Sequence, residues 1–115
     1  DQYWYQEGLL TYVGYRVGKT QGVSEKTRCQ ILDCVLFNEI PRVNSPEYME
    51  EWGTKKTARR LQKMAESIAS FTRNAKRNNS NTMRYAIDDW ESDLAYLYEY
   101  YYHHKLGFYW PETDL

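Results

Sequence analysis

Acidic and histidine side chains near the end of the chain have the types and spacing that could support catalysis or metal binding. Asp89 and Asp93 are four residues apart, which in a helix places two carboxylates on one face, where they could do acid–base or metal chemistry. Glu99 and His103 share that spacing and could share a metal ion. A structural metal site needs three or four such ligands, and the sequence nominates no others. We therefore expect solvated acids and a helix-end histidine, with no metal and no cofactor.

Other catalytic and nucleotide-binding chemistry is not indicated either. A serine or cysteine nucleophile needs a base and an orienting group, and no nucleophile-elbow motif accompanies either histidine. Residues 14–20 look like a phosphate-binding loop, but three residues separate Gly14 from Gly18 where the motif has four. We expect a non-catalytic protein with no small-molecule substrate.

Basic residues are concentrated in one predicted helix, expected from Thr54 to about Arg77. Residues 55–77 carry eight basic side chains against one acid, Glu66, a net charge of +7. The following helix, expected over about 82–104, is acidic. Part of this asymmetry fits internal pairing, and we expect Arg60, beside the apolar seam, to reach the acidic helix.

Four bases of that helix point away from the seam and form a stripe about 33 Å long, suited to contacting several phosphates; they are Lys55, Arg59, Arg73 and Arg77. The alternatives are an ordinary solvated face and an acidic protein partner. The sequence predicts contact with DNA or RNA backbone through Lys55, Arg59, Lys63, Arg73 and Arg77.

Tyrosines occupy the side of the last helix that faces away from its seam. Tyr85 and Tyr96 lie on this back, which we expect the N-terminal helices to cover. The alternative is a protein partner or a homodimer, because tyrosine brings contact area and a hydrogen-bonding tip at low entropy cost. The predicted partner surface consists of Tyr96, Tyr100 and Tyr102.

Residues 17–32 resemble the helix-turn-helix of bacterial repressors of the LacI type, which have a Gly-Val-Ser turn before the recognition helix. Arg28 departs from the family, whose pattern has a buried apolar residue there. The resemblance implies that Glu25, Lys26 and Gln30 face the major groove. The alternative is that the turn simply caps a core helix. The matching residues are Gly18, Gly22, Val23, Ser24, Thr27, Ile31 and Leu32.

Apolar residues at spacings of three and four predict the elements that position these side chains. The two longest seams indicate an antiparallel hairpin of helices over about 54–77 and 82–104. Shorter patterns predict helices over about 3–16, 24–38 and 45–53, the last being short. The fold class is all-α, a compact bundle of four main helices and one short helix. The seam residues are Leu61, Met64, Ile68, Phe71 and Ala75, then Met83, Ile87, Trp90, Leu94, Leu97 and Tyr101.

Composition limits the class of protein further. With 115 residues and a net charge of −1, we expect one domain over 1–115, excised from a larger protein, and no membrane partner. Cys29 and Cys34 lie too far apart on a helix for a disulfide, which favours a cytoplasmic location. We expect a non-catalytic helical binding module that contacts nucleic acid, or alternatively a protein-interaction domain.

Overall fold

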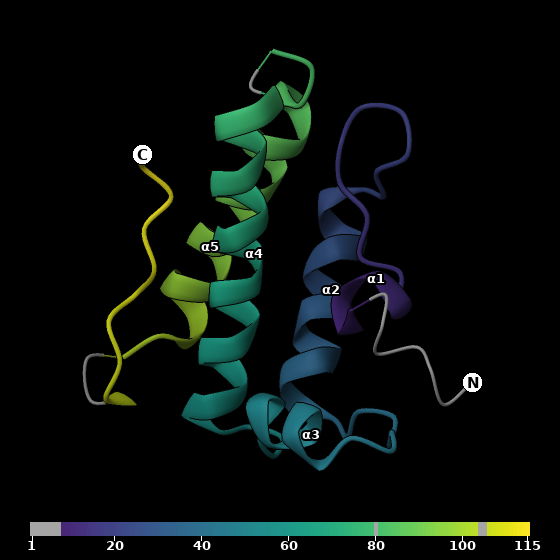
Figure 1. Cartoon of the computed structure of the whole chain (residues 1–115), viewed down its shortest axis with the longest axis vertical. Coiled ribbons are helices and arrows are strands. Elements are labelled where there is room, and N and C mark those ends of the chain that lie inside the picture. The colour runs from purple at the N-terminus through teal and green to yellow at the C-terminus, as the bar shows by residue number, and fades with distance from the viewer. Residues whose placement is uncertain (1–7, 80, 104–105) are drawn as a thin grey trace.

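The computed structural model describes residues 8–79, 81–103 and 106–115, and within these ranges every regular element is a helix. Figure 1 shows the two longest helices, α4 and α5, side by side, with α2 along them and α3 across one end. The predicted all-α bundle is therefore confirmed. The helices are α1 (Leu9–Tyr12), α2 (Glu25–Phe37), α3 (Pro46–Trp52), α4 (Ala58–Asn79) and α5 (Arg84–Tyr101).

The hairpin of α4 and α5 is confirmed, and most of its seam residues are buried. Phe71 is an exception at 39% exposed, while Thr72 is fully buried and its hydroxyl donates to the carbonyl of Ile68 (2.8 Å). Because eleven residues complete three turns of a straight helix, Thr72 rather than Phe71 continues the face that contains Leu61. The other buried seam residues are Met64, Ile68, Ala75, Ile87, Trp90, Leu94 and Leu97.

Side-chain caps fix the ends of the two middle helices as predicted. The Ser24 hydroxyl accepts from the backbone N–H of Thr27 (3.2 Å) and begins α2. The Ser45 hydroxyl accepts from the N–H of Tyr48 (3.3 Å) and begins α3. Gly53 ends α3 with φ of +63°, a conformation that favours glycine.

The observed ends of the two long helices differ from the predicted ends by a few residues. α4 begins after Thr57 rather than Thr54, because the Thr57 hydroxyl accepts from the N–H of Arg60 (3.2 Å). α4 runs on to Asn79, and α5 begins after Met83, which provides no side-chain cap, rather than after Thr82. α5 ends at Tyr101, before the predicted end at residue 104. The stop after this helix was predicted at residues 105–107, of which residue 105 lies outside the described residues and Gly107 has φ of +85°.

The first helix is much shorter than predicted. In the described part of the predicted helix, only Leu9–Tyr12 is helical, between Gly8 (φ +91°) and Gly14 (φ +94°), while residues 13–24 form turns and extended backbone. Both glycines adopt a conformation incompatible with a continuous right-handed helix. The predicted part over residues 3–7, including Trp4, lies outside the described residues.

The back of α5 is covered in part. α2 packs against both α5 and α4, and it covers Tyr96 near the end of α5. Tyr85, at the other end, remains 48% exposed beneath the ammonium group of Lys19, which lies 5.2 Å from the ring centroid. The prediction that N-terminal elements cover this face is right for Tyr96 and wrong for Tyr85.

Candidate functional site

The predicted phosphate-binding residues fall into two groups that differ in their partners. The two lysines have carboxylate partners: Lys55 lies before α4 with its Nζ 3.6 Å from Glu39 Oε1, and Lys63 Nζ lies 3.0 Å from Glu51 Oε1. Lys63 also lies 5.8 Å from the centre of the Trp52 ring. The positive charges of these two lysines are thus partly neutralised by carboxylates outside α4.

The three arginines of this set have no carboxylate within ion-pair distance among the described residues. Arg59 and Arg77 make no ion pair or hydrogen bond there, and Arg73 Nη1 donates to the backbone carbonyl of Glu112 (2.5 Å). A carbonyl is uncharged, so the charge of Arg73 remains uncompensated by it. Glu66, in the middle of the row, accepts from Gln62 (3.1 Å). Outward positive charge therefore persists at both ends of α4.

Arg60 does not reach the acidic helix, contrary to the prediction. Its side chain is buried and donates to the carbonyls of Val35 (2.5 Å) and Asn38 (3.0 Å) at the end of α2. It also donates to the carbonyls of Trp52 and Gly53 (both 2.9 Å) at the end of α3. Burial lowers the pKa of the guanidinium, and the charge of Glu39 opposes that shift. Arg60 is thus a structural cation that caps two helices.

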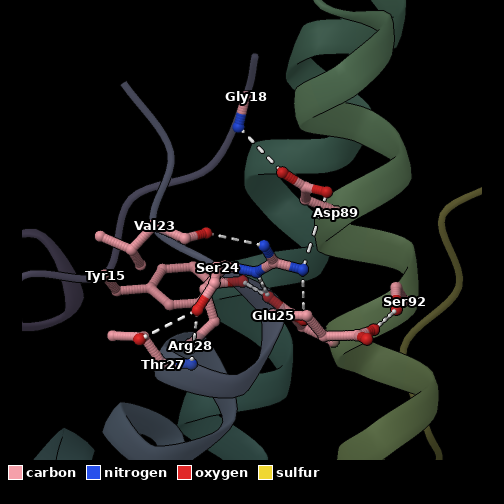
Figure 2. A network of polar contacts seen from close by, with 10 residues as sticks. Tyr15, Gly18, Val23, Ser24, Glu25, Thr27, Arg28, Asp89 and Ser92 are labelled. Atoms are coloured by element: carbon pink, nitrogen blue, oxygen red, sulfur yellow. Dashed lines mark hydrogen bonds and ion pairs between the residues drawn. The ribbon is translucent and has the colours of Figure 1, made fainter. Parts of the chain in front are cut away.

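We predicted that Asp89 and Asp93 are solvated acids on an exposed face, and this prediction is wrong. Asp93 is fully buried and accepts from Arg28 Nε (2.8 Å), Arg28 Nη2 (3.2 Å) and the phenol of Tyr15 (2.6 Å). Asp89 accepts from the N–H of Gly18 (2.9 Å) and lies 3.6 Å from Arg28 Nη2. Figure 2 shows how this network ties the N-terminal segment to α5. These carboxylates already have internal partners, which leaves them poorly placed for acid–base chemistry.

The helix-turn-helix implied by the resemblance is incomplete. Within residues 17–32 only the part from Glu25 onward is helical, and the preceding helix ends at Tyr12. The first helix that would cross the DNA backbone next to the turn is therefore missing. Arg28 is buried, as the family's position implies, but Asp93 neutralises its charge. Lys26 and Gln30 lie exposed on α2 without that supporting helix.

The predicted tyrosine surface is mostly engaged in intramolecular contacts. The phenols of Tyr96 and Tyr101 both donate to Asp33 Oδ1 (2.7 Å each) and fasten α5 to α2. Burial, followed by the bond to Asp33, raises the pKa of the Tyr96 phenol. Tyr102 donates to the carbonyl of Phe108 (2.5 Å). Tyr100 is the open member of the predicted set, at 63% exposed.

The C-terminal segment forms a groove with α5 that the sequence did not lead us to predict. Figure 1 shows this segment running back beside the hairpin. Lys76 Nζ donates to the carbonyl of Thr113 (3.1 Å), and the Thr113 hydroxyl donates to Glu91 (2.8 Å). The groove has a volume of about 830 Å³, and its aromatic wall includes Tyr98 and Trp110. The aromatic run after Gly107 was the available signal, but no periodicity indicated where it packs.

The described residues were also searched for metal-ligand clusters, disulfides and membrane-spanning helices. Among the described residues, no three histidine, cysteine, aspartate or glutamate side chains are grouped so that they could hold a metal ion. Cys29 and Cys34 are free thiols. No described helix combines the length and apolar character needed to cross a bilayer.

Comparisons with protein-family models, curated proteins and solved structures gave no match.

Proposed function

We propose that this chain is a non-catalytic helical binding module that contacts nucleic-acid backbone through the outer face of α4. The observation that supports this proposal most strongly is the row of Arg59, Arg73 and Arg77, whose charges have no carboxylate partner among the described residues. Arg59 and Arg77 are 18 residues apart on one helix, about 27 Å at 1.5 Å per residue. Guanidinium groups bind phosphate oxygens in a bidentate manner, so this row suits a phosphate backbone.

Lys55 and Lys63 are the secondary contacts in this proposal. Exposed ion pairs such as those with Glu39 and Glu51 contribute at most about 1 kcal/mol, so phosphate can replace the carboxylate at modest cost. Lys26 and Gln30 are on a different helix that lacks the support of a helix-turn-helix. The proposal therefore favours backbone contact, which positions a protein without reading sequence. An intracellular location is part of the proposal because both cysteines are free thiols.

Fluorescence anisotropy with a labelled DNA duplex of about 20 base pairs, and with single-stranded RNA of similar length, tests the proposal. We expect binding near 50 mM salt and a loss of about tenfold or more when Arg59→Glu and Arg77→Glu are combined. Arg42→Glu is the matched control, since Arg42 is exposed on the connector between α2 and α3. Absence of binding to either probe at low salt, or equal losses in both variants, would refute the proposal.

Protein interaction through the tyrosine face is the second candidate. It is favoured by the exposure of Tyr100 (63%), whose ring centroid lies 5.0 Å from that of Tyr96 on the same side of α5. A homodimer formed through these rings would appear as a doubled mass in light scattering, and Tyr100→Ser would return it to the monomer mass. A monomer at all concentrations would exclude the homodimer.

A further inference from the structure

The groove between α5 and the C-terminal segment combines a continuous aromatic wall with negatively charged side chains. Among the described residues, its lining includes four carboxylates and no lysine or arginine. Glu91 is paired with Lys76 (2.8 Å), and Arg73 reaches only the backbone of Glu112. The other three carboxylates have no cation within ion-pair distance among the described residues. They are Glu99, Glu112 and Asp114.

The aromatic wall is held in place before any ligand arrives. Tyr98 stacks on Tyr102 with ring centroids 5.3 Å apart, and Trp110 contacts Tyr98 and Tyr102 edgewise or tilted at 5.5 Å and 5.0 Å. The bond from Tyr102 to the carbonyl of Phe108 holds Phe108, two residues before Trp110, beside the end of α5. A fixed wall loses little side-chain entropy on binding.

Carboxylates beside aromatic faces are the chemistry that recognises ammonium and guanidinium groups. The rings attract a cation through their electron-rich faces, and a neighbouring carboxylate supplies the counter-charge. A volume of about 830 Å³ exceeds what a single metal ion or small amine fills. The carboxylates are also spread from α5 to the chain end, so they suit several cations along one extended ligand.

We propose that this groove binds an extended, lysine- or arginine-bearing segment of another protein. The choice of occupant rests on charge complementarity and on the volume of the groove. Nucleic acid would be repelled by the same carboxylates, so the groove suits a different ligand from the outer face of α4, which it adjoins where Arg73 donates to the carbonyl of Glu112. The inference stands whether or not α4 contacts nucleic acid.

Labelled peptides of about ten residues, alternating lysine with glycine or glutamate with glycine, test the groove by fluorescence anisotropy. We expect the lysine peptide to bind near 50 mM salt and the glutamate peptide not to bind. Glu99→Gln should weaken binding by about fivefold, and adding Glu112→Gln should weaken it further. The matched control is Glu47→Gln, the same change at an exposed position on α3.

A second readout locates the site without depending on stability. In a proton–nitrogen NMR spectrum, the indole signal that disappears in Trp110→Phe should shift when the lysine peptide binds to the wild-type protein. Binding should survive the combined Arg59→Glu and Arg77→Glu changes, which separates this surface from α4. The proposal is overturned if the lysine peptide does not bind, or if binding leaves that signal unmoved. Self-association abolished by Glu99→Gln would also overturn it, because a second copy would then be the occupant.

Discussion

Two arginines are buried in this protein, and they are stabilised in different ways. Arg28 lies against carboxylates, with Asp93 accepting two of its N–H groups and Asp89 nearby. Arg60 contacts only backbone carbonyls, at the ends of α2 and α3. Both side chains are almost fully excluded from water, at 4% and 1% exposed. One site therefore relies on ion pairing and the other on the negative ends of helix dipoles.

The comparison shows which positive charges remain for a ligand. Arg60 belongs to the basic helix, but its charge stabilises the contact of α4 with the ends of α2 and α3. The charge of Arg28 stabilises the contact of the N-terminal segment with α5. Lys63 and Lys76 have carboxylate partners. The outward arginines of α4 are left, and Arg60 fixes the start of the helix that presents them.

The largest expected effect comes from Arg60→Ala. Two buried and two partly buried carbonyls at two helix ends would lose their donors, and a cavity would form, so we expect a loss of about 5 kcal/mol in the free energy of unfolding. Arg60→Lys should recover only part of this, because one ammonium cannot reach both helix ends. Urea unfolding followed by circular dichroism measures both variants, with Arg42→Ala as the surface control. A loss below about 1 kcal/mol would show that the dipole site is dispensable.

Asp93→Ala should be the next most damaging change. It leaves the Arg28 guanidinium buried without its main partner, for an expected loss of about 3 to 5 kcal/mol. Replacing the network with apolar groups, Arg28→Met with Asp93→Leu and Tyr15→Phe, should regain most of that stability. No such rescue exists for Arg60, whose partners are backbone atoms. If the triple variant is as unstable as Asp93→Ala, the ion-pair explanation of this site is wrong.

Alkaline pH should affect the Arg28 site through Tyr15. Burial, followed by the charge of Asp93, raises the pKa of the Tyr15 phenol, so the folded state keeps a proton that the unfolded state releases near pH 10. Stability is therefore present below about pH 10 and falls as the pH rises further. In Tyr15→Phe, we expect the slope of unfolding free energy against pH above 10 to be shallower by up to about 1.4 kcal/mol per pH unit. An unchanged slope would show that the Tyr15 phenol does not cause the loss of stability at alkaline pH.

Glu91→Gln should have the smallest effect. The hydrogen bond from Lys76 lowers the pKa of Glu91, so its contribution is present above about pH 4.5 and is lost as the pH falls through the lowered value. Because this pair is partly exposed, we expect a loss of at most about 1 kcal/mol at pH 7 and less near pH 3. Urea unfolding at the two pH values gives the difference. An equal loss at both would mean that the ion pair is not responsible.

The helical hairpin was predictable because an apolar seam is a local property of the sequence. Spacings of three and four in α4 and α5 place one stripe on each helix, and burial of those stripes requires a partner. The helix ends were less predictable, since Thr54 and Thr57 are both acceptable caps. Packing of Arg60 against the two preceding helices selects Thr57.

The polar sites were only partly predictable. Arg28 was already conspicuous as a charged residue where the resemblance has an apolar one, but its partner Asp93 lies 65 residues further on. Arg60 binds carbonyls, which every residue carries, so no side-chain pattern could nominate its partners. The groove beside α5 depends on where an irregular segment folds back, and no periodicity governs that.

The salt dependence of binding measures whether α4 contacts the nucleic-acid backbone. The affinity of the wild-type chain for a DNA duplex is measured by anisotropy between about 50 and 200 mM salt. Each neutralised phosphate contributes about −0.9 to the slope of log affinity against log salt. With Arg59, Arg73 and Arg77 in contact, we predict a slope of about −3 or steeper, reduced to about −1 by Arg59→Glu with Arg77→Glu. Binding that does not change with salt, or a slope that both substitutions leave unaltered, would contradict the proposal.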